Sequence, residues 1–388
     1  MPTCEAIGAL ARAHSAVIVG DPKQMPPTNF FATVRTDDEE AEIDDLDSIL
    51  DDCISLSMPE HKLGWHYRSK HESLITFSNI NYYNNNLVTF PSSDDKVSHV
   101  KWQHVEGYYD YGKTRTNFAE ADAITNEIIE RLISYPDKSI GVIAFSKQQS
   151  DLIEDILAEK ISSYPRLVKA NNENPEPLFI KNLENVQGDE RDIILFSVGY
   201  GPDKNGHVSM NFGPLNKIGG EKRLNVAISR ARYEMKIFST LRPEQIDERR
   251  TQAEGVIGLK NFLKFAQKGN DILAKTSKNK ESQMIRQIAQ RLEEEGYEVR
   301  TSVGTSDLKI DIAVADPLNP DKYILGVICD GENYYRLKTI RDREVVQPSV
   351  LGMLGWNLMH VWSIDWLFNR EIVMKNLLSS IKNKISLK

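Results

Sequence analysis

The sequence predicts an α/β protein with a parallel sheet, followed by a second and smaller α/β unit. Short runs of β-branched residues alternate with helix-like segments over the first two thirds of the chain, which favours parallel strands joined by helices. After a polar, lysine-rich stretch, the alternation starts again. The 388 residues are enough for two or three domains of ordinary size.

The elements of the first unit follow from periodicity and capping signals. Asn117 stands three residues before Glu120, a capping-box spacing that predicts a helix through about Leu132. A second helix is expected over 147–161. Buried strands are expected at AVIVG (16–20), SIGVIAFS (139–146), DIILFSVGY (192–200) and MKIFSTL (235–241).

The second unit begins after residues 243–280, whose polar composition predicts a linker or a domain boundary. A helix is expected at about 281–295. Strands are expected at EVRTSV, LKIDIAV and YILGVIC, and an aromatic-rich strand, NLMHVWS, follows a charged helix. This pattern predicts an α/β unit of roughly 110 residues.

The cysteine count and hydropathy exclude several protein classes. Cys4, Cys53 and Cys329 are widely separated and odd in number, which argues against a disulfide framework or a CxxC metal pair. A reducing, cytoplasmic location is therefore expected. No apolar run approaches the ~20 residues of a membrane span, so we expect no membrane partner.

The net charge of -8 comes from one short stretch. Residues 37–52 contain ten acidic residues and no basic residue, and the rest of the chain sums to +2. Such a run is most often a solvated face or an insertion. The net charge therefore does not exclude nucleic acid as a partner.

A phosphate-binding-loop pattern occurs at Gly107–Thr114 (GYYDYGKT). A functional loop of this kind needs a helix that starts at the Lys-Thr pair. The capping signal at Asn117 places the helix start beyond Lys113, and three tyrosines fill the variable positions. We interpret the match as a coincidence.

Four blocks appear in order along the chain: GDPKQMPP (20–27), WHYRSKHESLITFSN (65–79), ENVQGDERDIILFS (184–197) and RLNVAISRAR (223–232). Together they resemble the later motifs of superfamily 1 helicases, in the branch of the eukaryotic nonsense-mediated-decay helicase. The resemblance covers about residues 1–243. It implies a RecA-like motor lobe with the P-loop NTPase fold, the second of the two lobes in such a motor.

The resemblance also implies roles for single residues. Gln24, after Asp21, would report the γ-phosphate of ATP to the nucleic-acid side. Arg68 and Arg230 would be arginine fingers, which stabilise the charge that develops during phosphoryl transfer. Isolated arginines in such sequences are usually surface ion-pair partners, and only the co-occurrence of the four blocks favours the catalytic interpretation.

The third block would bind the nucleotide. The resemblance implies that Glu190 contacts the ribose or phosphate and that Gln187 and Gly188 form the tight turn beside it. Arg223 and Asn225 are equally compatible with a structural role. Helicases of this family hold single-stranded nucleic acid by its backbone, so we expect such a partner, DNA in preference to RNA, with salt-dependent binding.

In this family a glycine-rich loop with a lysine and an acidic DEAxQ strand end precede the first block. Neither is found before Asp21. The resemblance therefore implies that ATP and Mg²⁺ bind only together with an N-terminal helicase lobe, which becomes an expected partner. We expect residues 1–388 alone not to hydrolyse ATP appreciably.

Residues 281–369 resemble the restriction-endonuclease-like domain related to very-short-patch-repair endonucleases, through GYEV, KIDIAV, YILGVICDG, IRDR, LGW and VWSIDW. The resemblance implies that Asp311 and Asp330 hold a divalent metal. Ile285, Ile328 and Tyr335 replace two acids and a histidine that the pattern usually contains. A metal-dependent endonuclease is therefore one hypothesis, with impaired catalysis favoured.

The other hypothesis for this unit is a degenerate nuclease fold that binds DNA. Lys338, Arg341 and Arg343 would then contact phosphates, with Trp362 and Trp366 in the core. For the whole chain, the alternative to a helicase portion is a non-catalytic nucleic-acid-binding fragment.

The expected domain division follows from both resemblances. Residues 1–58 would be the tail of the first RecA-like lobe with an acidic insertion, and 59–243 the second RecA-like lobe. Residues 244–280 would be the linker, and 281–388 the restriction-endonuclease-like α/β domain.

Overall fold

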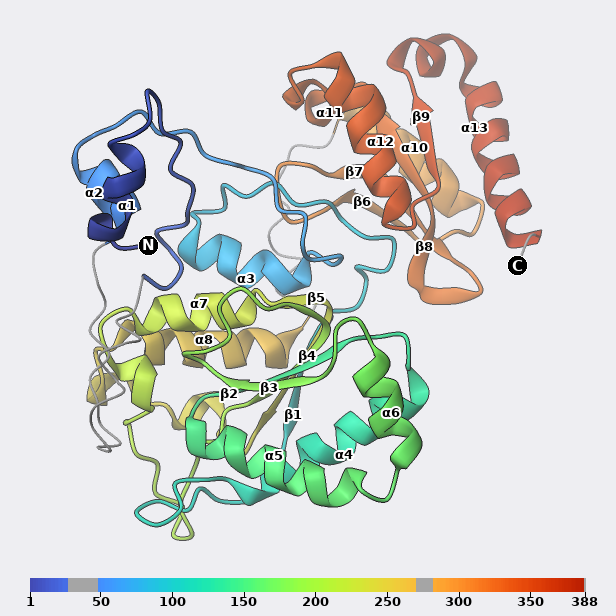
Figure 1. The fold of residues 1–388 in the computed structure, drawn as a ribbon. Helices are drawn as coiled ribbons and strands as arrows, with labels where there is room; N and C mark the ends of the chain where they lie inside the picture. Colours follow the sequence, from blue (N-terminus) through green and yellow to red (C-terminus); the bar gives the residue numbers. More distant parts are fainter. Residues whose placement is uncertain (27–47, 270–281, 387–388) are drawn as a thin grey trace.

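The computed structural model describes residues 1–26, 48–269 and 282–386, and contains two sheets with helices on both faces of each (Figure 1). The acidic run at 37–52 lies mostly outside the described residues. Within the described ranges, no helix combines the length and the apolar character needed to cross a membrane.

The first sheet has five strands, and every neighbouring pair is parallel. Its order is β1-β5-β4-β2-β3. The strands are β1 (Val100–His104), β2 (Ile140–Ala144), β3 (Phe179–Asn182), β4 (Arg191–Ser197) and β5 (Ala231–Ser239). The central strands β2 and β4 are almost wholly buried, as expected for a parallel sheet covered on both faces. The predicted parallel α/β fold is confirmed.

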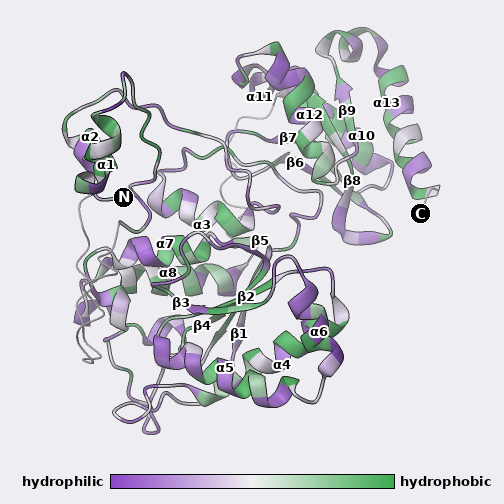
Figure 2. Cartoon of the chain, in the orientation of Figure 1, coloured by the Kyte–Doolittle hydropathy of each residue, from purple (hydrophilic) through white to green (hydrophobic). Residues whose placement is uncertain are grey.

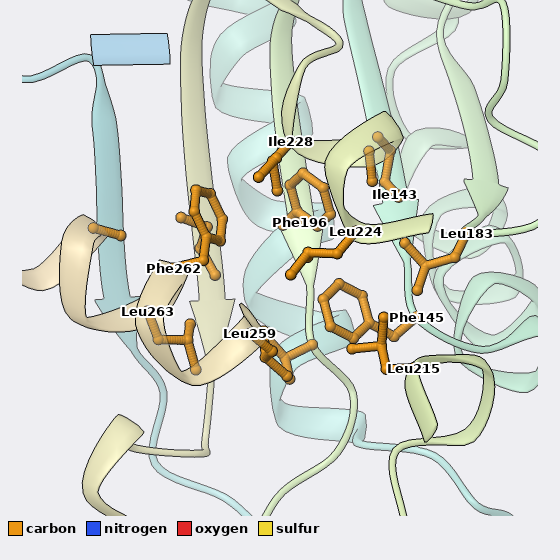
Figure 3. Close-up of a cluster of buried hydrophobic side chains, with 14 of the residues drawn as sticks. Ile143, Phe145, Leu183, Phe196, Leu215, Leu224, Ile228, Leu259, Phe262 and Leu263 are labelled. Carbon is orange, nitrogen blue, oxygen red and sulfur yellow. The ribbon is translucent and has the colours of Figure 1, made fainter. Parts of the chain in front are cut away.

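Helices cover both faces of this sheet (Figure 1). On one face lie α4 (Phe118–Ser134) and α5 (Lys147–Ile161), with α6 (Pro165–Glu173) beyond them. The other face is covered by α3 (Ser73–Tyr82), α7 (Gly220–Ile228) and α8 (Glu254–Lys268). Figure 3 shows Leu224 of α7 and Leu259 of α8 in contact range of the apolar side chains of the sheet.

The two predicted helices begin where their capping residues place them. The Asn117 side chain accepts a hydrogen bond from the Glu120 amide at 3.2 Å, and the Ser146 hydroxyl accepts one from the Gln149 amide. The helix therefore starts beyond Lys113, and the Gly107–Thr114 segment is a loop without a helix N-terminus, as predicted.

The strand predicted at 16–20 is wrong. These residues form an irregular segment in which Val17 is 89% and Val19 is 78% exposed. Among the described residues no strand pairs with them, and β-branched residues form a buried strand only when neighbouring strands supply hydrogen bonds and cover. The segment leads from α1 (Thr3–Leu10), which lies beside α2 (Ile49–Ser55) away from the sheet (Figure 1).

The linker predicted at 244–280 also differs from the structure. Helix α8 lies inside this range, and its residues Val256, Leu259, Phe262 and Leu263 are buried in the same core as α7 and the sheet. The stretch looked like a linker because its polar residues fall on the outer face of an amphipathic helix. Residues 270–281 lie outside the described residues.

Short 3₁₀ helices connect the strands and helices of this first unit. They are η2 (Gly213–Asn216), η3 (Pro243–Gln245) and η4 (Glu248–Arg250).

The second sheet is mixed, with the order β6-β7-β8-β9. Its strands are β6 (Val299–Val303), β7 (Ile310–Asp316), β8 (Asn319–Cys329) and β9 (Leu358–Val361), and only β8 and β9 pair in parallel. Its helices are α10 (Gln283–Glu294), α11 (Glu332–Arg336), η6 (Asp342–Val346), α12 (Gln347–Met353) and α13 (Ser363–Ser386). Figure 2 shows hydrophilic and hydrophobic residues alternating along α13, whose apolar side packs with α10 against the sheet.

The two units share one apolar cluster. Phe90, from the segment between α3 and β1, is buried with Leu351 and Trp356 of the second unit. The Trp356 indole donates to the Pro91 carbonyl at 2.8 Å, and the Tyr323 amide donates to the Ser93 carbonyl at 2.7 Å. The units are therefore packed against each other and do not depend on the covalent connection alone.

Candidate nucleotide and metal sites

The four sequence blocks meet at one end of the five-stranded sheet. The first block is an irregular segment, the second leads into α3, and the third forms the turn before β4. The fourth spans α7 and the start of β5, next to β4. Glu190 directly precedes β4 and Arg230 directly precedes β5, so the blocks converge at the amino ends of these two parallel strands.

Arg68 of the second block reaches the third block. Its Nε donates to Glu190 Oε2 at 2.6 Å, and its Nη1 donates to the Ser229 carbonyl at 3.2 Å. Both side chains remain partly exposed, at 27% and 37%. The Arg68 guanidinium is therefore held in position from one side while part of it stays accessible to solvent.

Arg230 of the fourth block reaches the first block. Its Nε donates to the Val226 carbonyl at 2.8 Å, and its Nη2 donates to Gln24 Oε1 at 3.2 Å. The Gln24 amide in turn donates to Asp21 Oδ2 at 3.0 Å. The structure thus brings together the glutamine and the arginine that the sequence places 206 residues apart.

The charge of Arg230 has no carboxylate partner. The side chain is 2% exposed, and among the described residues it forms no ion pair with an acid. Burial, and next the positive charge of Arg68, lower the pKa of Arg230 to about 10. Arg223, in helix α7 before Arg230 and equally buried, pairs with Glu184 at 3.0 Å. Glu190 and Asp189 raise the pKa of Arg230 in part through their charge, without an ion pair to it. A buried cation with no directly bonded counter-charge is unfavourable and favours an anion beside it.

A hydrogen-bond network that sequence reasoning missed supports these residues. Tyr83 donates to Asp21 Oδ2 at 2.7 Å, and the Asn225 side chain donates to the Tyr83 hydroxyl at 3.0 Å and to the Lys23 carbonyl at 2.9 Å. Burial, and then the bond to Asp21, raise the pKa of Tyr83. Tyr83 lies four residues beyond the second block, at the end of α3, and a tyrosine at a helix end gives no sequence signal for this contact.

Gln187 and Gly188 lie at the turn where they were expected. Gln187 Nε2 donates to the Met25 carbonyl at 3.4 Å, and Gly188 has a φ of +94°, a conformation that favours glycine. An open hollow of about 830 Å³ lies beside them, and Asp21, Gln24 and Lys222 are among its lining residues. The turn therefore faces a space large enough for a small ligand.

In the second unit, Asp311 is buried in β7 and its carboxylate is already engaged. Its Oδ2 accepts from the Cys329 amide at 2.7 Å, and its Oδ1 accepts from the Asn333 side chain at 2.8 Å. Burial raises the pKa of Asp311. This environment is that of a structural carboxyl group inside a fold.

Asp330 is turned toward a different partner. It accepts from both the amide and the hydroxyl of Ser363, at 2.6 and 2.7 Å, at the start of α13. Ile285 and Ile328, at the usual acid positions, are buried in apolar clusters. Among the described residues, no set of three metal-ligating side chains includes either aspartate. A divalent metal held by Asp311 and Asp330 therefore stays a prediction.

The tryptophans of this unit differ in burial. Trp366 is 4% exposed and lies in the core, as expected. Trp362 is 38% exposed, so its expected place in the core is wrong. Trp362 comes directly after the short edge strand β9. Its ring lies 3.9 Å from the His360 ring, centroid to centroid. Lys338 and Arg341 are exposed too, in the segment between α11 and η6, whereas Trp362 follows β9.

Each of the two units matches a family of known proteins. The family of the AAA domain matches residues 46–242, half of the chain, and the family REase_MTES_1575 matches residues 285–381. Two similar proteins are the uncharacterized ATP-dependent helicase MG140 of Mycoplasma genitalium (28% identity, 97% of this chain) and its Mycoplasma pneumoniae homolog (29%, 96%). This chain covers 35% of each, so it spans about a third of these relatives.

Two further similarities are more distant. The DNA polymerase alpha-associated DNA helicase A of Saccharomyces cerevisiae is 25% identical over 59% of this chain and 34% of its own length. The crystal structure of the C-terminal domain of a possible DNA helicase from Lactobacillus plantarum WCFS1 covers 45% of this chain and 86% of its own, at 12% identity and a TM-score of 0.25. The chain belongs to the AAA-domain family that forms the C-terminal part of superfamily 1 helicases, and a restriction-endonuclease-like domain follows it.

Proposed function

We propose that this chain is the C-terminal portion of an ATP-dependent superfamily 1 helicase and supplies one side of its ATP site. The observation that supports this most strongly is Arg230, a buried guanidinium that contacts Gln24 and has no acidic partner among the described residues. A phosphate group at this position would provide a directly bonded negative charge.

Each residue of the cluster has a distinct part in this proposal. ATP, bound with Mg²⁺, would supply the γ-phosphoryl group that is transferred, with ADP as the leaving group. Arg230 and Arg68 stabilise the charge that develops on that group, which is the largest contribution proteins make to phosphoryl transfer. Glu190 holds Arg68 in place through their 2.6 Å contact. Gln24 binds Arg230, so a movement of one is passed to the other.

The remaining part of the ATP site would come from an N-terminal lobe. We infer that the lobe described here extends from about residue 59 to Lys268, because α8 is part of its core. Residues 1–58 would then belong to the tail of the first lobe. The exposed Val17 and Val19 agree with this division, because that lobe would cover them.

Single-stranded DNA is the proposed substrate of the motor. The loops of the four blocks would hold its backbone, and binding would weaken as salt is raised. For the second unit we propose DNA binding without cleavage, since Asp311 and Asp330 are engaged by Cys329, Asn333 and Ser363. Magnesium-dependent nicking of plasmid DNA, lost in Asp311→Ala, would instead support an endonuclease.

Steady-state ATP hydrolysis tests the main proposal. The full polypeptide that contains this chain should hydrolyse ATP, with stimulation by single-stranded DNA, whereas residues 1–388 alone should not. Arg230→Ala in the full polypeptide should lower kcat by about 10³-fold or more. Clear turnover by residues 1–388, abolished by the same substitution, would contradict the proposal.

A further inference from the structure

Two histidines and an aspartate gather where the two units meet. His71 precedes α3, His99 precedes β1, and Asp94 lies in the segment between those elements. One ligand atom from each of the three lies within 4.8 Å of the other two. His71 Nδ1 and Asp94 Oδ1 are 3.5 Å apart. Two imidazoles and a carboxylate are a donor set that suits zinc and similar transition-metal ions.

The orientation of His99 is that of a metal ligand. Its Nδ1 lies 3.0 Å from the Tyr233 carbonyl oxygen. Because a carbonyl can only accept, Nδ1 must carry the hydrogen, and the lone pair is then on Nε2. A backbone carbonyl that fixes the imidazole tautomer in this way is the usual outer partner of a metal-binding histidine.

The two imidazole rings are stacked. Their centroids are 3.3 Å apart and their planes differ by 14°. Two positively charged rings would repel each other at this separation, so the arrangement fits neutral imidazole, the form that binds metals. Ligand atoms around tetrahedral zinc are about 3.3 Å apart, so the three ligand atoms, which lie within 4.8 Å of one another, would move closer together on binding an ion.

Both oxygens of Asp94 have polar neighbours. Asp94 Oδ2 faces Lys322 of β8 at 3.9 Å, whereas Oδ1 accepts from the Ser92 hydroxyl at 2.5 Å and also faces His71. Asp95 Oδ1 lies 3.2 Å from His71 Nδ1, the same nitrogen that faces Asp94 Oδ1, so both carboxylates meet one edge of that ring. A fourth ligand would be water, since Asp94 is partly exposed.

We propose that His71, Asp94 and His99 bind one Zn²⁺ ion per chain. The three residues flank the segment that carries Phe90, Pro91 and Ser93 into contact with the restriction-endonuclease-like domain. The ion would fasten this segment to α3 and β1 and thereby stabilise the junction between the two domains.

Titration of metal-free residues 1–388 with Zn²⁺ in a calorimeter tests the site, and Co²⁺ absorption reports its geometry. One equivalent of Zn²⁺ should bind. Asp94→Asn and His99→Gln should each weaken that binding by about tenfold or more. His104→Gln is the matched control, because His104 lies at the end of β1 with its Nδ1 at 3.1 Å from the Ser239 carbonyl, outside the cluster.

Three results would overturn the proposal. They are the absence of a single-equivalent binding event in the parent chain, unchanged binding in Asp94→Asn, and an equal loss in His104→Gln. If His99→Gln does not fold by circular dichroism, Asp94→Asn decides the question, because its carboxylate is 28% exposed and its replacement removes little packing. Equal affinity for Mg²⁺ would overturn the assignment to zinc.

Discussion

Replacing Arg230 with methionine should make the protein more stable. The substitution keeps an unbranched side chain of similar length but removes a buried charge that has no acidic partner among the described residues. Most buried arginines stabilise a fold through an ion pair, and their removal is costly. If Arg230 is kept for an anionic ligand, its removal should have the opposite effect.

The magnitude follows from the contacts of Arg230. Burial and the neighbouring Arg68 lower the pKa of Arg230 to about 10, which corresponds to about 3 kcal/mol of unfavourable free energy in the charged form. Methionine also forfeits the bonds to Gln24 and to Val226, at about 1 kcal/mol each. The Val226 carbonyl still accepts from the Ser229 hydroxyl. The expected net gain is about 1 kcal/mol.

Urea unfolding of residues 1–388, followed by circular dichroism, measures this difference. Arg223→Met is the matched control, since Arg223 belongs to the same sequence block and is equally buried but pairs with Glu184. The control should be destabilised by about 3 kcal/mol, because Glu184 loses its partner. A loss of more than about 1 kcal/mol in Arg230→Met would refute the reasoning and identify Arg230 as a structural residue.

Three further predictions concern the fold. Leu259→Ala, at a fully buried position of α8, should lower the free energy of unfolding by about 3 kcal/mol, whereas a linker residue would change it by less than about 0.5. The parent chain should unfold in a single calorimetric transition, and Trp356→Ala should split it into two, because the substitution removes the largest side chain of the cluster that the two units share. Two transitions in the parent chain would contradict a shared core. Burial raises the pKa of Glu120 to about 7, so the folded state holds a proton that the unfolded state releases between about pH 4.5 and 7. The free energy of unfolding should therefore fall as pH rises through that window. Measured by urea unfolding, this pH dependence should be weaker in Glu120→Gln, and an unchanged pH dependence would refute the assignment to Glu120.

The sequence allowed much of the fold to be predicted, because its signals were local. The Asn117 and Ser146 caps and the buried β-branched runs of β2 and β4 depend on neighbouring residues, and the structure contains these elements at those places. The run at 16–20 has the same composition, but a strand also needs partner strands, which no local pattern can supply.

The sequence pattern named candidate residues for the site, but it could not give their contacts. The four blocks identified Gln24, Arg68 and Arg230, and the structure brings them to one end of the sheet. Tyr83 and the zinc-binding cluster were missed, because their members are unremarkable singly and meet only through tertiary packing. The engagement of Asp311 by the Cys329 amide was likewise invisible, since it depends on how β7 and β8 pair.

The affinity of the full helicase polypeptide for a transition-state analogue of ATP hydrolysis tests the central claim most directly. An arginine finger acts on the charge that develops during transfer, so Arg230→Ala should weaken binding of ADP with aluminium fluoride by about 10²- to 10³-fold and leave ADP binding nearly unchanged. Equal affinities of parent and variant for the analogue would contradict the role of Arg230 at the ATP site.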